Sequence, residues 1–292
     1  MTAAILPVRR NLQFFLPKDR INDWNGGGAH WTQFLNTLSL FFPAGERFFI
    51  QSVRNYRNDV VDKELKKAVS AFIGQEAFHT REHEEYNEAM VEAGIPIDKM
   101  EASVQKLLDF LQENAPRPLQ LAVTVALEHL TAMLANIVME DDRFIKNSDP
   151  HYEALWKWHA MEETEHKGVC YDVYEEVVGK GPAAYALRSV TFVAANVIFW
   201  SLFYRYYYLV MKSRNEHKNL SGWMKSFRYQ FGKRGVFPSL IGEWLSFFKP
   251  GFHPWDIDNS HLLDEAEELM RVVDTFAEQA NLVPAKGDAA AA

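Results

Sequence analysis

The pattern of apolar and polar residues predicts a chain that is almost entirely helical. Proline and glycine set several boundaries: Gly94-Ile95-Pro96 ends one predicted helix, and Asp149-Pro150 begins another. Pro43 lies inside the first apolar segment, where it either kinks a helix or marks the true start of one. Residues 1–30 show no helical pattern. We predict helices over about 32–55, 61–93, 98–114, 118–140, 150–178, 182–211 and 259–281.

We interpret this pattern as one helical domain with a C-terminal extension, because no linker interrupts it. The expected fold class is all-α, with a four-helix bundle as its centre and additional helices after it. The parts are an irregular N-terminal arm over 1–30, a bundle with a crossover helix over 31–180, a helical extension over 181–282 and a disordered tail over 283–292.

The C-terminal extension changes from apolar to basic along its length. Residues 189–204 carry no charge, whereas residues 205–234 carry eight lysines or arginines and one acid, Glu216. The uncharged stretch is shorter than the ~20 residues that span a bilayer, and Arg205 interrupts its continuation. Three interpretations stay open: a helix buried in the protein or in a homodimer interface, peripheral contact with a membrane through 189–234, and a true span.

Composition narrows the classes of function. With 292 residues, of which 48% are hydrophobic, the chain is long enough for a large buried core. The net charge of −8 argues against a nucleic-acid partner. Cys170 is the single cysteine, which excludes a disulfide framework and a cysteine-based zinc site. This cysteine usage and an N-terminus unlike a secretory signal predict a cytoplasmic protein, with membrane association as the alternative.

Acidic residues occur in an ordered series on four of the predicted helices. Glu46 lies among phenylalanines, and Glu128 lies in the apolar segment VTVALEHLTAM. Two E-x-x-H motifs alternate with them, and three-residue spacing places both side chains of such a motif on one helix face. Glutamate, E-x-x-H, glutamate, E-x-x-H on separate helices is the ligand order of a di-metal carboxylate site in a four-helix bundle. The motif residues are Glu76 with His79 and Glu163 with His166.

The spacing of the glutamates places them at matching heights. Glu46 and Glu76 lie equally far from a predicted turn just after residues 56–59, and Glu128 and Glu163 lie equally far from a polar stretch near 146–150. Residues equidistant from the turn of an antiparallel helix pair meet at the same level. The segment 94–117 is long enough to cross the bundle between the two pairs. We therefore expect all four glutamates in one layer of the interior.

Several other residues have a structural interpretation as well as a chemical one. His159 lies one turn before Glu163 and is a candidate third nitrogen ligand, or else a satisfied core histidine. His83 is a candidate for supporting the ligands from behind. We expect His129 and Cys170 to be packing residues. The charged neighbours of the two motifs suggest solvated helix faces as the alternative to a metal site; these neighbours are Glu82, Glu84, Glu162 and Glu165.

The ligand order resembles that of the ferritin-like di-iron carboxylate proteins. His159 four residues before Glu163 is similar to the three-histidine site of arylamine N-oxygenases within that class. The segments HWTQFLNTLSLFFPAGERFF, QEAFHTREH and WHAMEETEHKGVCYDVY resemble a bacterial family called predicted metal-dependent hydrolases, over about residues 5–280. By position, the resemblance implies seven metal ligands: Glu46, Glu76, His79, Glu128, His159, Glu163 and His166.

The expected function is a di-iron oxygenase or oxidase that uses O₂ to oxidise a small apolar or amine-bearing substrate. Two iron ions are the expected cofactor, with manganese as an alternative, and a reductase or other electron donor is the expected partner. A two-metal hydrolase, with zinc and metal-bound hydroxide attacking an ester, amide or phosphate, is the second hypothesis. A non-catalytic metal-binding helical protein is the third.

Overall fold

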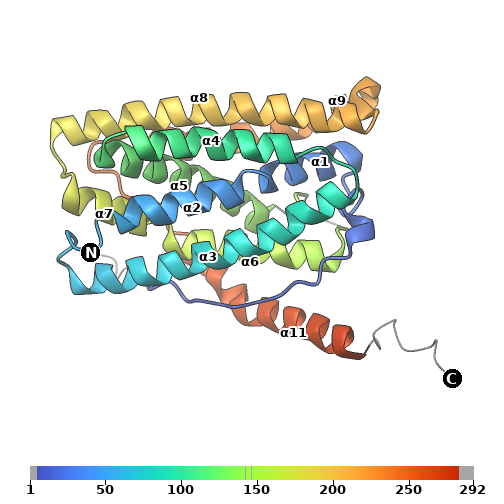
Figure 1. Ribbon diagram of the computed structural model, residues 1–292, viewed down its shortest axis with the longest axis horizontal. Helices are drawn as coiled ribbons and strands as arrows, with labels where there is room; N and C mark the ends of the chain where they lie inside the picture. The colour runs from blue at the N-terminus through green and yellow to red at the C-terminus, as the bar shows by residue number, and fades with distance from the viewer. Residues whose placement is uncertain (1–4, 142, 146, 283–292) are drawn as a thin grey trace.

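The computed structural model describes residues 5–141, 143–145 and 147–282, which are all helices, turns and irregular segments without a strand. The tail that we expected to be disordered, 283–292, lies outside the described residues. The all-α class is therefore confirmed (Figure 1). The α-helices are α1 (Ala29–Ser39), α2 (Phe42–Arg54), α3 (Lys63–Glu92), α4 (Asp98–Asn114), α5 (Arg117–Glu140), α6 (Pro150–His166), α7 (Val169–Val177), α8 (Pro182–Ser213), α9 (Leu220–Phe231), α10 (Val236–Ser246) and α11 (Ala266–Leu282). Short 3₁₀ helices are η1 (Lys18–Arg20), η2 (Glu216–Lys218), η3 (Pro254–Asp256) and η4 (Ser260–Glu265).

Four helices form the centre of the bundle. α2 packs along α3, and α5 packs along α6. Contacts between α2 and α5 and between α3 and α6 close the ring. The paired helices are connected between Arg54 and Lys63 and between Glu140 and Pro150, where the equal spacing of the glutamates had placed the connections. The interior of the bundle is thus shared by two helical hairpins.

Two predicted helices are interrupted. The segment 32–55 is two helices, and Pro43 lies in the first turn of α2, so the proline marks a start, one of the two expected outcomes. The single helix predicted over 150–178 is wrong, because the chain turns at Lys167-Gly168 between α6 and α7. A Cβ at Gly168 would lie 2.8 Å from Trp255, and the Lys167 ammonium donates to Asn259. Residues about 90 positions later therefore cause this interruption.

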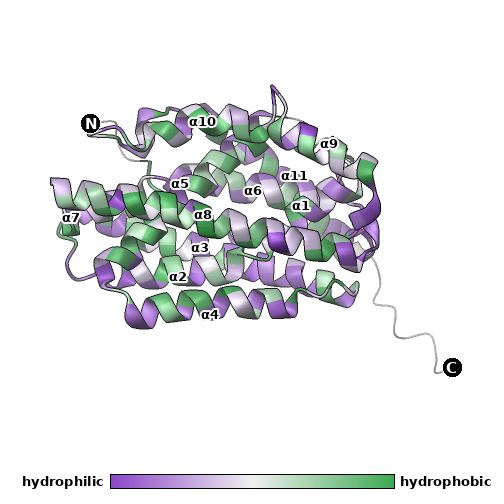
Figure 2. Cartoon of the chain, turned by 90° about the horizontal axis from the view of Figure 1, so that it is seen from above, coloured by the Kyte–Doolittle hydropathy of each residue, from purple (hydrophilic) through white to green (hydrophobic). Residues whose placement is uncertain are grey.

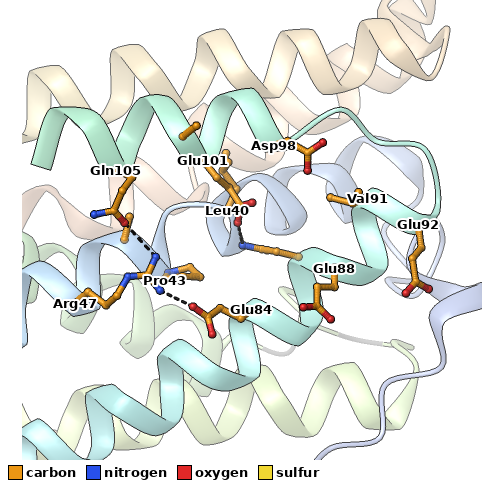
Figure 3. Close-up of a pocket in the computed structure, with 13 residues that line it drawn as sticks. Leu40, Pro43, Arg47, Glu84, Glu88, Val91, Glu92, Asp98, Glu101 and Gln105 are labelled. Carbon is orange, nitrogen blue, oxygen red and sulfur yellow. Dashed lines mark hydrogen bonds and ion pairs between the residues drawn. The ribbon is translucent and has the colours of Figure 1, made fainter. Parts of the chain in front are cut away.

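The crossover helix α4 has the predicted bounds, 98–114, and lies against α2. Polar contacts tie it to the bundle across a hollow on the surface (Figure 3). Arg47 of α2 donates to Gln105 of α4 at 3.1 Å, and the Asn87 amide of α3 donates to Glu101 at 2.6 Å. These bonds fix the rotation of α4 relative to α3.

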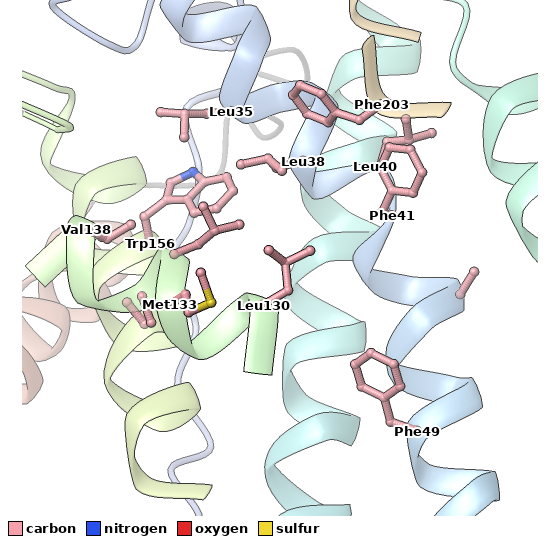
Figure 4. Close-up of a cluster of buried hydrophobic side chains, with 14 of the residues drawn as sticks. Leu35, Leu38, Leu40, Phe41, Phe49, Leu130, Met133, Val138, Trp156 and Phe203 are labelled. Atoms are coloured by element: carbon pink, nitrogen blue, oxygen red, sulfur yellow. The ribbon is translucent and has the colours of Figure 1, made fainter. Parts of the chain in front are cut away.

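A continuous apolar core joins the bundle to the helices around it. Leu35, Leu38 and Phe41 meet Leu130 and Met133 of α5 in its interior (Figure 4). α8 packs along α5 and against α1, where Phe203 lies 4.8 Å from the ring of Phe34. The last helix, α11, packs on α6, and it is preceded by η4, where one helix over 259–281 was expected.

Two of the described helices are long and apolar enough to cross a membrane. In α5, 78% of the apolar window is buried, as expected of the core helix of a bundle. In α8, only 33% of that window is buried, so this helix presents apolar side chains on its outer face.

Asn36 of α1 connects three parts of the interior and gives the first testable prediction. Its side chain accepts from Trp24 at 2.9 Å and from Tyr86 at 2.6 Å, and it donates to the Ile21 carbonyl at 2.9 Å. Asn36→Leu leaves these three buried groups without partners. We expect it to lower the free energy of unfolding by about 3–5 kcal/mol, as measured by urea denaturation.

Asn114→Leu, at the exposed end of α4, is the matched control and should change the free energy of unfolding by about 0.5 kcal/mol or less. Equal effects of the two substitutions would contradict the role assigned to Asn36.

Candidate metal centre

The four central helices bring the seven predicted side chains to one place. α2 supplies Glu46, α3 supplies Glu76 and His79, and α5 supplies Glu128. Each of the seven is at most 3% exposed. Their donor atoms form three overlapping groups, in each of which the atoms lie within 4.8 Å of one another. The groups are Glu46, His79 and His159; Glu76, His79 and Glu163; and Glu76, Glu128 and His166.

Glu163 lies between two halves of this cluster. Its Oε1 is 2.9 Å from Nε2 of His159 and 3.9 Å from Nδ1 of His79. Its Oε2 is 3.3 Å from Nε2 of His166. The carboxylate thus presents one oxygen to each half, and Glu76 also belongs to two of the three groups.

The outer carboxylates complete the two halves. Oε1 of Glu46 is 3.9 Å from Nε2 of His159. On the other side, Nε2 of His166 is 3.4 Å from Glu76 and 3.7 Å from Glu128. The cluster therefore offers two neighbouring positions, each surrounded by carboxylate oxygens and imidazole nitrogens.

Burial makes this cluster electrostatically unfavourable without a cation. Burial raises the pKa values of Glu46, Glu76 and Glu128 well above the ordinary carboxyl range. Burial opposes ionisation of Glu163 too, but the neighbouring imidazoles of His166 and His159 hold its pKa well below that range. Burial also lowers the pKa of His79 well below its usual value, so its imidazole is neutral.

The donor atoms fit a divalent metal. Both oxygens of Glu46, Glu76 and Glu128 are buried without a hydrogen-bond partner. Both ring nitrogens of His166 are also without one. Buried polar atoms normally have partners, and an unpaired carboxylate in the interior costs several kcal/mol. Metal ligation accounts for these groups because it supplies both a partner and compensating charge.

A second layer of polar groups holds His79 from behind. Its Nε2 lies 3.2 Å from Glu162, which also accepts from the Trp158 indole at 2.9 Å. Arg10 of the N-terminal arm pairs with Glu162 at 3.2 Å and with Glu165 at 2.6 Å. A carboxylate on the far nitrogen of an imidazole fixes its orientation and raises its basicity as a ligand.

This second layer excludes the alternative of solvated helix faces for three glutamates, and it adds Arg10 to the site. The alternative of solvated helix faces is wrong for Glu82, Glu162 and Glu165, which are 2%, 0% and 4% exposed. Among these neighbours, Glu84 alone was placed correctly at the surface. Arg10 was missed because nothing in its local sequence points to α6. The sequence offered one signal for the burial of these acids: in HAMEETEH, apolar residues precede them on the same helix.

His83 lies behind His159, as expected of a supporting residue. Its Nε2 is 2.6 Å from Nδ1 of His159, and its Nδ1 is 2.8 Å from Oγ of Ser39. The hydroxyl of Ser39 in turn donates to Oδ1 of Asn87 at 2.8 Å. Among the described residues, none of the three donor groups that could hold a metal includes His83.

The directions of these bonds assign the protonation of both rings. The carboxylate of Glu101 only accepts, so it fixes the Asn87 amide with Nδ2 outward and Oδ1 toward Ser39. Since Ser39 donates to Asn87, Nδ1 of His83 must donate to Ser39. Nε2 of His83 then accepts from Nδ1 of His159. This network leaves the Nε2 lone pair of His159 directed at the cluster.

His129 and Cys170 are packing residues, as predicted. The His129 ring stacks on Phe247 with 4.9 Å between ring centroids, and burial lowers its pKa to about 3. Cys170 is fully buried, and burial raises the pKa of its thiol well above the usual value. A buried neutral thiol is unreactive.

An apolar cavity of about 350 Å³ reaches the cluster from one side. Its walls come from α2, α4, α5 and α8, and its lining includes Glu46 and Thr131. Thr131 donates to Oε2 of Glu163 at 2.6 Å, so both of these residues belong to the edge of the cluster. The cavity thus connects the buried donors to the outer helices.

Arg10 gives the second prediction. Arg10→Met leaves Glu162 and Glu165 buried without their cation, and removing one partner of a buried ion pair costs about 3–5 kcal/mol. Arg9→Met, at the adjacent exposed residue that bonds to Ser70, is the control. We expect the free energy of unfolding in urea to fall by at least about 3 kcal/mol for Arg10→Met alone. Equal free energies of unfolding for the two variants would contradict the role assigned to Arg10.

Comparison with known proteins and families assigns the chain to one family. No curated protein matches it, and no solved structure does. The sequence pattern of one family, described as "Predicted metal-dependent hydrolase", matches residues 8–258, a range that contains all seven donors. The chain therefore belongs to the family of predicted metal-dependent hydrolases.

Proposed function

We propose that the protein is a di-metal enzyme in which the seven donors hold two divalent cations. Glu46, His79 and His159 would hold one cation, and Glu128 and His166 would hold the other, with Glu76 and Glu163 shared. The observation that carries this proposal is the convergence of buried carboxylates and imidazoles that lack other partners. Four carboxylates balance the charge of two such ions.

We propose further that the metal is iron and that the reaction is an oxidation by O₂. Mixed carboxylate and imidazole donors suit iron, and three nitrogens are available here. When bound, ferrous ions would supply electrons to O₂, and a separate electron donor would be needed to restore them. The residues of the chain hold the ligands in place: Glu162 orients His79, His83 orients His159, and Thr131 holds Glu163. The apolar cavity beside Glu46 favours an uncharged substrate and keeps water scarce.

A two-metal hydrolase is the second candidate, because the family is described as metal-dependent hydrolases. In that reaction the same seven donors would hold the metals, and these would supply activation of water for hydrolysis of an ester, amide or phosphate. The cavity lining carries no lysine or arginine, so it gives little support for a phosphate substrate. An ester of an apolar acid is the hydrolytic substrate that the cavity would suit best.

Metal content and O₂ uptake test the proposal. Protein purified without chelator should contain about two metal ions per chain by elemental analysis. The iron-loaded, reduced protein should consume O₂, and the zinc-loaded protein should not. Ester hydrolysis by the zinc-loaded protein without O₂, combined with no O₂ uptake by the iron form, would overturn the oxidase in favour of the hydrolase.

Glu128→Gln separates ligation from a structural role. The amide should lower the metal content by at least half, because it removes an anionic ligand. In chelated protein it should leave the melting temperature unchanged or raised, because burial already favours a neutral side chain there. Glu85→Gln, on the exposed side of α3, should change neither quantity. Full metal content in Glu128→Gln would contradict the ligand assignment.

A further inference from the structure

The cavity that reaches Glu46 is apolar along its whole length. α4 contributes Val104, Leu107, Leu108 and Leu111 to the lining, and α8 contributes Val190, Ala194, Ile198 and Leu202. Glu46, Thr131 and Thr191 are the polar residues of the lining, and the first two lie at the edge of the donor cluster. An elongated apolar molecule would therefore meet polar groups mainly at the inner end.

The outer end of the cavity opens beside α8. Val190 and Ile198, which line it, are 69% and 50% exposed. No cationic residue lines the cavity, so a negatively charged head group would find no counter-charge inside. Such a head group would stay at the outer end, in water, while the apolar part enters.

We propose that this cavity is the binding site for a long unbranched alkyl or acyl chain whose apolar end reaches the donor cluster. The proposal rests on the proposed function for the reaction at that end, although chain binding itself needs no metal. It narrows the substrate to lipid-like molecules, and a compact polar substrate would not use most of the lining.

Gly45 allows the cavity to be shortened without disturbing the helix. It lines the cavity one residue before Glu46, and a Cβ built there meets only Phe49, at 3.8 Å. Gly45→Leu would fill space beside the inner end, and replacing a glycine inside α2 favours the helix. Gly242→Leu is the matched control, because Gly242 lies inside α10, where an added Cβ has nothing within 4 Å.

Competition against dansyl-undecanoic acid, using straight-chain alcohols from hexanol to tetradecanol, tests the proposal. Affinity should rise by about fourfold per methylene, from ~0.8 kcal/mol per buried CH₂, until the chain fills the cavity. Gly45→Leu should weaken binding of the longest chains by about tenfold, and Gly242→Leu should leave it within about twofold. Affinity without dependence on chain length, or equal binding by the two variants, would overturn the proposal.

The metal content of both glycine variants keeps this result separate from the proposed function. Chain binding by protein that holds no metal would support the cavity and reject the di-metal enzyme. Two metals per chain without chain binding would do the reverse.

A different observation concerns the outer surface formed by α8, α9 and α10, which we call the basic face. α9 and α10 pack on each other (Figure 2), and the rings of Trp200 and Phe237 join α8 to the start of α10. Apolar side chains on α9 are exposed at helical spacing: Leu220 at 75%, Met224 at 73%, Phe227 at 64% and Phe231 at 43%. Isolated apolar residues are common on surfaces, but a stripe of them marks a binding surface.

The charge of the basic face identifies what it would bind. Residues 217–242 contain five lysines or arginines and no acid, in a chain whose net charge is −8. Lys225 and Arg228 are exposed on α9, beside Met224 and Phe227. Apolar side chains flanked by cations fit the surface of an anionic bilayer. In a dimer of this chain, the basic face of one copy would meet the basic face of the other, and the like charges would repel.

We infer that the basic face binds anionic membranes peripherally. The exposed residues that line the outer end of the cavity, Val190 and Ile198, belong to α8, one of the helices of this face, so a chain could pass from the bilayer into the cavity. The inference does not depend on the metal centre, since it is carried by exposure and charge alone.

Vesicle sedimentation tests this second inference. The protein should bind vesicles in which phosphatidylglycerol replaces part of the phosphatidylcholine, and added salt should weaken the binding. Lys225→Glu with Arg228→Glu should reduce the affinity at least about 25-fold, from about fivefold per basic residue. Lys63→Glu with Lys66→Glu makes the same charge change on α3, on the opposite side of the molecule, and should have little effect.

Equal loss of binding in the two charge-reversed pairs would overturn the inference, because only net charge would then matter. So would a dimer in sedimentation equilibrium that dissociates on Met224→Gln with Phe227→Gln, combined with no vesicle binding. That outcome would assign the face to a homodimer.

Discussion

Four glutamates buried at one level of a helical bundle are the constraint that organises this protein. A carboxylate removed from water is costly, and four of them within a few ångströms repel one another. The structure places three imidazoles among them, and the oxygens of Glu46, Glu76 and Glu128 are left without a hydrogen-bond partner among the described residues. The positions of these residues along their four helices direct all of the donors toward the interior at the same level. The surrounding aromatic core, including Phe72 against His166 and Phe42 against His159, keeps water away.

Much of this arrangement could be read from local sequence. The bounds of α4 agree with the prediction because Pro96 lies just before the helix and Pro116 just after it. The two E-x-x-H motifs were found because their spacing is a local property of helices, and the matching heights of the glutamates needed only the positions of two turns. Spacing left His159 as a candidate, and the set of seven came from the resemblance. The all-helical class follows from the same periodicity.

The remaining features depend on partners far away in the chain. Glu162 and Glu165 looked like solvated acids, and what buries them is Arg10, more than 150 residues earlier. The break between α6 and α7 requires the approach of Trp255 and Asn259. Local periodicity carries no information on such contacts. The same reason explains why α9 and α10 were not delimited in advance, since their apolar residues lie both in the core and on the surface.

The hydrogen bonds from Glu101 to His159 have a direction as well as a geometry. Every bond in the series donates the same way because one end is a carboxylate that can only accept. Glu101→Gln would put an amide in place of that acceptor, and an amide can donate as well as accept. The orientation of Asn87 would then depend on its longer, 3.3 Å bond to the Ser39 carbonyl, and the series that ends at the lone pair of His159 would lose its fixed end. A half-buried carboxylate on α4 thus helps to specify the centre, although α4 contributes no donor to it.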